Sequence, residues 1–148
     1  MKITYKGDYA LKTILDLAIH YNKGVITIHD LAKRADMPLK FLEQVLLELK
    51  KGGFVDSKRG VNGGYFLAKP PQEIRLGDVV RFIDGPIEPI PCANRSAAYK
   101  GCADVYRCAF KNIWMEVTDS IIKIIDNVTF EDLAKKSKDK DKAISYHI

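Results

Sequence analysis

Hydrophobic residues in the first half of the chain recur every three or four positions, the spacing that gathers them on one face of an α-helix. This pattern predicts a first helix over residues 8–21, a short second helix capped by Thr27, and a third helix whose first turn holds Pro38. Gly52 and Gly53 end the third helix. The residues of this helix that we expect to face the core are Phe41, Leu42, Val45, Leu46 and Leu49.

The hydrophobic period shortens after the third helix. The segments FVDSK and YFLAK have the length and composition of two short β-strands, and the segment RGVNGG between them supplies the glycines that a tight turn needs. Helix, short helix, longer helix and hairpin follow each other in the order of a winged helix–turn–helix. The pattern therefore predicts a mainly α fold with a small β-hairpin wing.

The second half of the chain contains a long apolar stripe. A short helix over LGDVVRFID ends at Gly85, and Pro86, Pro89 and Pro91 exclude regular structure after it. From about residue 104 to residue 127, apolar side chains recur every three or four positions, which predicts a helix about 35 Å long. Because a small winged domain does not need so long a helix, we expect it to pack against its copy in a homodimer. The alternative is that it folds back onto its own chain.

These patterns divide the chain into four parts. Residues 1–70 form the predicted winged helix–turn–helix, and residues 71–103 form a linker with a short helix and a cysteine loop. Residues 104–128 form the predicted dimerisation helix. Residues 129–148 hold a short helix capped by Thr129 and a tail of alternating charge that we expect to be mobile.

The charge of the chain is unevenly distributed. The chain has 148 residues, of which 47% are hydrophobic and 29% charged, and this size and composition fit one domain. Because it has no long apolar run, we expect a cytoplasmic protein without a membrane partner. Residues 1–70 hold 12 Lys and Arg against 7 Asp and Glu, whereas residues 71–148 hold 12 of each. This asymmetry favours a polyanion such as double-stranded DNA as the partner of the first half, the alternative being a solvated basic surface.

The third helix offers side chains for reading DNA bases. A recognition helix places its early, outward residues at base edges in the major groove, and here these are Lys40, Glu43 and Gln44. Gln can pair with adenine, Glu can accept from cytosine, and Lys suits guanine or phosphate. The alternative role for Glu43 is an ion pair within the helix.

The wing offers a second set of contacts. Lys58 and Arg59 precede the glycines of the turn, and an arginine in a narrow minor groove gains from the negative potential there. The remaining candidates, all for phosphate contacts, are Thr27, Lys33, Tyr5, Lys6 and His29.

All three cysteines, Cys92, Cys102 and Cys108, lie in one Gly- and Ala-rich segment. An odd number of cysteines cannot all pair in disulfides, and cytosolic thiols stay reduced. Three thiolates on a flexible loop can hold an iron–sulfur cluster, either 2Fe–2S or 4Fe–4S. The alternatives are a zinc site with a fourth ligand, a metal-free thiol switch, or small buried side chains with no metal.

The sequence lacks the motifs of an enzyme. It has no glycine-rich phosphate loop, nucleophile elbow or paired acid–base set, and no histidine lies near the cysteines in sequence for a catalytic Cys–His pair. We therefore expect a binding protein.

Three segments of the chain, YKGDYALK, FLEQVLLELKKGGFVDSKRGVNGGYFLA and CADVYRCAFKNIW, resemble the Rrf-two family of bacterial transcription regulators. The resemblance covers roughly residues 1–130 and implies a dimeric winged-helix protein that binds a pseudo-palindromic operator. It places the base-contacting pair of the family on Glu43 and Gln44, and its minor-groove arginine on Arg59.

The resemblance also implies a cluster, with two departures in this chain. The family separates its three cysteines by five residues each, whereas here the first gap holds nine residues and the second five. The histidine that completes the cluster in the iron–sulfur cluster regulators is replaced by Lys111. In the nitric-oxide-sensing branch an aspartate from the other subunit completes it, at the position of Asp8. The alternative role for Asp8 is to cap the first helix.

Overall fold

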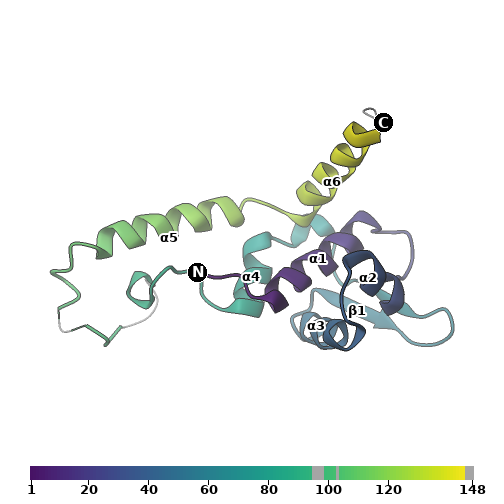
Figure 1. Cartoon of the computed structure of the whole chain (residues 1–148), viewed down its shortest axis with the longest axis horizontal. Helices are drawn as coiled ribbons and strands as arrows, with labels where there is room; N and C mark the ends of the chain where they lie inside the picture. The colour runs from purple at the N-terminus through teal and green to yellow at the C-terminus, as the bar shows by residue number, and fades with distance from the viewer. Residues whose placement is uncertain (95–98, 103, 146–148) are drawn as a thin grey trace.

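The chain folds into six α-helices and one β-hairpin in this computed structural model, which describes residues 1–94, 99–102 and 104–145. Figure 1 shows a helical body with the hairpin on one side, and the helices over residues 111–125 and 130–145 project from this body in different directions. The first three helices and the hairpin follow in the predicted order, so the winged helix–turn–helix is confirmed. The elements are α1 (Tyr5–Ile19), α2 (Ile28–Ala35), α3 (Leu39–Lys51), β1 (Val55–Lys58), β2 (Gly64–Leu67), α4 (Leu76–Asp84), α5 (Lys111–Ile125) and α6 (Phe130–Ser145), with 3-10 turns η1 (Pro71–Glu73) and η2 (Pro91–Ala93).

Helix α1 lies at the centre of the body and packs against α3, α4 and α6. Its buried face is built by Ala10, Ile14 and Leu17, whose spacing is that of one helix face. The hydroxyl of Thr13, also buried there, donates to the carbonyl of Tyr9 at 2.7 Å, so its burial leaves no donor unpaired. The inward side of α3 is confirmed, because Leu42, Val45, Leu46 and Leu49 are buried and Phe41 packs edge-on against Tyr9.

Threonines begin three of the helices. Thr4 caps α1, so this helix starts three residues before the predicted position. Thr27 caps α2 as predicted, since its hydroxyl oxygen accepts from the amide of Asp30 at 3.2 Å. Thr129 caps α6 in the same way, and its amide and hydroxyl hold the pKa of Asp132 below its usual range. These local hydrogen bonds fix where the chain enters each helix.

The wing is joined to the rest of the body by a short backbone bridge. Strand β1 pairs with β2 in antiparallel register, Val55 opposite Leu67. Ile26, in the loop before α2, exchanges two backbone hydrogen bonds of 2.9 and 2.8 Å with Tyr65 on β2. The close approach needs a residue without a side chain at Gly64, where an added Cβ would lie 2.6 Å from the carbonyl oxygen of Ile26.

Replacing Gly64 by alanine is therefore expected to destabilise the protein by about 1–3 kcal/mol, because the methyl group would push against a backbone that cannot move without breaking the bridge. Thermal unfolding followed by circular dichroism measures this effect. The exposed Asn62→Ala, in the same turn, is the matched control and should leave the midpoint nearly unchanged. Equal unfolding midpoints for the Gly64→Ala and Asn62→Ala variants would show that the backbone bridge between Ile26 and Tyr65 adds nothing to the stability of the protein.

Helix α4 coincides with the predicted segment, but the long helix after the cysteines is shorter than predicted. It begins at Lys111 and not near residue 104, so its 15 residues span about 22 Å in place of 35 Å. The carboxylate of Asp104 accepts a hydrogen bond from the amide of Arg107 at 3.1 Å. This side-chain turn competes with helical hydrogen bonds, which explains why the apolar periodicity starts before the helix does.

Helix α6 is longer than predicted. The sequence suggested a short helix and a mobile tail, yet the helix runs to Ser145, with Lys135 and Glu131 paired at 3.4 Å one turn apart. Its first residues are anchored, because Phe130 and Ala134 are buried in the core. Residues 146–148 of the predicted tail lie outside the described residues. Within the described part of the chain, no helix has the length and apolar character needed to cross a membrane.

Candidate nucleic-acid interface and cysteine segment

The outer face of α3 presents a row of exposed side chains. Lys40, Glu43 and Gln44 are exposed, as predicted, and Leu47 extends the row by one further turn with 55% of its surface accessible. Glu43 takes part in no ion pair among the described residues, so the alternative role of an intrahelical pair is not found. Leu47 was predicted neither for the core nor for DNA contact, because an apolar side chain on a helix does not by itself indicate a DNA contact. An apolar side chain at this place can contact a thymine methyl group.

A groove of about 560 Å³ runs between α3 and the wing. The structure brings Thr27, Glu43, Lys58 and Arg59 together along its walls. Gln44 and Lys40 lie on the same helix beside it, and Lys33 is exposed on α2, outside the groove. The groove therefore combines polar side chains of a helix with basic side chains of a wing.

Lys50 holds the recognition helix against the wing. Its ammonium group donates to the hydroxyl of Ser57 at 2.7 Å and lies 3.4 Å from a carboxylate oxygen of Asp56 on β1. The backbone amide of Ser57 and this lysine keep the pKa of Asp56 below its usual range. Lys50 thus fixes the distance between the two walls of the groove. No local pattern in the sequence indicates this contact.

The candidate phosphate contacts near the start of α1 differ in their surroundings. Tyr5 is almost fully exposed, whereas the ammonium group of Lys6 lies 3.2 Å from the carboxylate of Glu48 on α3. His29 is exposed beside Thr27. Lys6 therefore ties α1 to the recognition helix in addition to carrying a positive charge.

The three cysteines carry free thiols, and the described residues around them form little regular structure. Cys92 is in η2 and half-buried, Cys102 is exposed, and Cys108 is half-buried before α5. Among the described residues, no three His, Cys, Asp or Glu side chains are grouped closely enough to bind one metal ion. The donors fit an iron–sulfur cluster in their chemistry, since three uncommitted thiols are present, but the single protomer does not gather them.

Lys111, one of the two departures from the family pattern, and Asp8, the candidate fourth ligand, each have a partner in the structure. The ammonium group of Lys111 lies 5.2 Å from the centre of the Tyr106 ring, a cation–π contact that suits a protonated lysine and not a metal ligand. Asp8 lies in the first turn of α1, where its carboxylate pairs with Lys12 at 2.6 Å and raises the pKa of that lysine. The cap of α1 is Thr4, so the alternative role of Asp8 as the cap is wrong.

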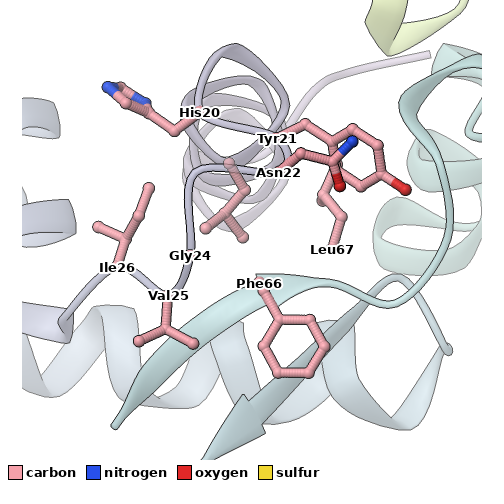
Figure 2. A pocket seen from close by; sticks show the side chains of 9 residues that line it. His20, Tyr21, Asn22, Gly24, Val25, Ile26, Phe66 and Leu67 are labelled. Carbon is pink, nitrogen blue, oxygen red and sulfur yellow. The ribbon is translucent and has the colours of Figure 1, made fainter. Parts of the chain in front are cut away.

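A separate pocket of about 370 Å³ lies between the end of α1 and β2. Figure 2 shows that its polar side chains do not converge: the His20 ring points away from Tyr21 and Asn22. The ring nitrogen of His20 lies 2.8 Å from the carbonyl of Asp16. The same nitrogen lies 3.2 Å from a carboxylate oxygen of Asp16, which does not line the pocket, so the polar contacts of His20 are with its own helix and not across the pocket.

The fold and the groove define a winged-helix protein of the DNA-binding type. A family model described as Rrf2, iron-dependent transcriptional regulator, matches residues 3–136. The chain belongs to the Rrf2 family of transcriptional regulators and is not an enzyme.

The relatives support this assignment in sequence and in structure. The chain is 42% identical over 137 residues to an rrf2-like HTH-type transcriptional regulator of Rhodobacter capsulatus, covering 88% of this chain and 91% of the relative. It is 34% identical over 143 residues to the regulator IscR of Pectobacterium carotovorum, covering 97% and 85%. Among solved structures, CymR of B. subtilis, described as the global cysteine regulator, superposes with a TM-score of 0.77 at 30% identity, covering 92% and 98%. IscR of T. potens superposes with 0.73 at 30% identity, covering 93% and 88%.

Proposed function

We propose that a homodimer of this protein binds a pseudo-palindromic operator in double-stranded DNA, in the cytoplasm. The groove between α3 and the wing carries this proposal, because it sets Glu43 and Arg59 on facing elements. Helix α3 enters the major groove, where Glu43 and Gln44 contact base edges and Lys40 contacts a base or phosphate. Arg59 enters the neighbouring minor groove, while the remaining contacts, all to phosphate, come from Lys58, Thr27 and Lys33.

The exposed apolar face of α5 supports the homodimer. Only Thr118 of this helix is buried in the protomer. Five large apolar side chains at its surface are between 37% and 66% exposed: Phe110, Ile113, Trp114, Val117 and Ile124. A contiguous apolar surface of this kind marks an interface, and a second copy of α5 has the matching chemistry. Two copies of α3 would then face two operator half-sites about 34–36 Å apart, or a multiple of that distance.

We further propose that Cys92, Cys102 and Cys108 hold a 2Fe–2S or 4Fe–4S cluster, with Asp8 of the partner subunit as its fourth ligand. Such a cluster supplies a redox- and nitric-oxide-sensitive group. Asp8 supports this role because its side chain is partly exposed at the start of α1 and is not needed as a cap. A carboxylate is a harder ligand than a thiolate, so the cluster should be labile, as a sensor requires.

A second candidate is a metal-free thiol switch, or a zinc site, in the same segment. The observation that favours the thiol switch is that the three thiols are not gathered in the protomer, with Cys102 exposed and open to oxidation. A zinc site, like the cluster, would need the thiols to be brought together. CymR, a structural neighbour, is described as a cysteine regulator. Metal analysis of protein purified without oxygen separates the three possibilities.

The DNA proposal is tested by separating the two reading elements. Arg59→Ala is expected to weaken binding most on operators with a narrow A·T-rich minor groove, because it removes the readout of groove shape. Gln44→Ala is expected to relax base preference in the major groove and to cost about 1–3 kcal/mol of binding free energy on the preferred sequence. Selection of binding sites from random DNA, followed by titration at two salt concentrations, measures both effects.

The control for lost positive charge is Lys51→Ala, an exposed lysine at the far end of α3. It should lower affinity uniformly, if at all, and leave the selected sequence unchanged. Arg59→Ala and Gln44→Ala variants that lose the same affinity on every sequence would contradict the assignment of the two elements. A wild-type protein that selects no sequence would contradict the function.

A further inference from the structure

The last residue of α4 contacts the first turn of α1. The backbone amide of Thr4 donates to one carboxylate oxygen of Asp84 at 3.1 Å, and the Thr4 hydroxyl donates to the other. The oxygen of that hydroxyl accepts from the amide of Gly7 at 3.0 Å. The negative charge of Asp84 therefore lies at the N-terminus of α1, where free amides and the helix dipole stabilise an anion.

The contact depends on a residue without a side chain at Gly7. A Cβ atom added there would lie 2.1 Å from a carboxylate oxygen of Asp84, so any larger residue must displace the aspartate. Gly7 is helical and buried, and it directly precedes Asp8. Asp84 thus sits against the turn of α1 that carries the proposed cluster ligand.

The segment that contains the cysteines starts at this contact. Gly85 follows Asp84 with φ 86° and ψ −161°, a backbone conformation that other residues rarely adopt, and it turns the chain toward Cys92. The same segment ends at α5. Asp84 is therefore the last α-helical residue before the cysteines.

Two side-chain contacts near the end of helix α4, one turn apart, differ in strength. Arg81 donates from two nitrogens to both carboxylate oxygens of Asp126 at the end of α5, each at 2.8 Å. That bidentate pair joins two charged groups, and it raises the pKa of Arg81. Among the described residues, the hydrogen bonds of Asp84 are with the neutral donors of Thr4. Of the two, the contact with α1 is the one that a change in the cysteine segment would break first.

We propose that Asp84 is a positioning residue through which the state of the cysteine segment controls the DNA-binding surface. With the contact made, α1 is held against α4; with it broken, the first turn of α1 is released. The ion pair of Lys6 with Glu48 joins that turn to α3, so the recognition helix is repositioned with it. This inference rests on the proposed role of the cysteines as the sensing segment.

The first test compares operator affinity of the cluster-loaded and cluster-free dimer. In the wild type the two affinities should differ by about tenfold, within the usual range for coupled sites. Asp84→Ala and Gly7→Ala should each reduce the difference to about twofold or less by removing the contact from opposite sides. Asp78→Ala, an exposed carboxylate on the same helix, is the matched control and should keep the wild-type ratio. Because Gly7→Ala also improves helix propensity, its loss of coupling is not a loss of helix stability.

The second test needs no cluster. Coupling between two sites is reciprocal, so operator DNA must change the accessibility of the cysteine segment. The alkylation rate of Cys102 by iodoacetamide in metal-free protein should change about fivefold or more on adding operator in the wild type, and should not change in Asp84→Ala or Gly7→Ala.

The two tests separate the failure of each proposal. If the wild type takes up no cluster but operator alters alkylation only while Asp84 is present, the positioning role stands and the cluster proposal fails. If the Asp84→Ala and Gly7→Ala variants keep the wild-type affinity ratio or the wild-type alkylation response, the positioning role is overturned and the cluster is unaffected. The positioning role is also overturned if, in the wild type, operator affinity does not depend on the cluster and the alkylation rate of Cys102 does not depend on operator.

Discussion

Cys102→Ala is expected to remove the visible iron–sulfur absorption of protein purified without oxygen. Three thiolates are all that this segment can offer to a cluster, and the loss of one leaves two thiolates and a carboxylate. Because the thiolates form the strongest bonds to iron in this set, we expect no residual cluster, whereas Asp8→Ala should alter the spectrum and speed cluster loss. Anaerobic absorption spectra with iron and sulfide analysis measure the difference.

The control for this experiment is Lys111→Ala. Its side chain lies over the Tyr106 ring and occupies the place of the family's histidine ligand, so its removal should leave the spectrum unchanged. A colourless wild type with bound zinc, or without metal, would refute the cluster and support the second candidate. An Asp8→Ala protein with unchanged spectrum and lifetime would show that another group completes the site.

Ile113→Glu is expected to convert the protein into a monomer. Ile113 is among the most exposed apolar residues of α5, and a carboxylate in a closely packed apolar interface costs several kcal/mol in each subunit. A monomer contacts one operator half-site, so we expect the affinity to fall by about 100-fold or more. Sedimentation at micromolar concentration and operator titration measure the two effects.

Asn112→Glu provides the matched control, because it introduces the same charge at an exposed polar position one residue earlier. This variant should remain a dimer and bind the operator. A wild type that sediments as a monomer, or an Ile113→Glu protein that remains a dimer, would place the interface elsewhere or remove it.

The features that sequence predicted well are local ones. The caps at Thr27 and Thr129 depend on residues three positions away, and the bounds of α4 follow from its apolar period and Gly85. The outward side of α3 follows from helix geometry once its inward residues are known. Each of these depends on neighbours within one or two helical turns, which a sequence displays directly.

The features that sequence missed depend on contacts between distant residues. Thr4 and Asp84 are 80 positions apart, and nothing near either one indicates the other. Lys50 looks like any basic residue at the end of a helix until β1 is folded beside it. The late start of α5 has a local cause, the turn at Asp104. It was missed because the apolar residues of this turn have the same spacing as those of the helix that follows. The sequence also could not predict how far apart the three cysteines lie, because a loop has no periodic spacing of apolar residues from which to infer it.

The return of α6 to the body has a consequence for how the protein is made. Phe130 and Ala134 belong to the same buried cluster as Ala10 and Ile14. The segment between α4 and α6 therefore interrupts, in sequence, the elements that form this one core. A ribosome releases this segment, with its exposed apolar helix, before it releases the residues that close the core. Each nascent chain therefore exposes an aggregation-prone apolar surface while the hydrophobic core of its DNA-binding body is still incomplete. For the same reason a fragment that stops before α6 lacks part of its own interior, and the DNA-binding body cannot be cut out as an N-terminal piece.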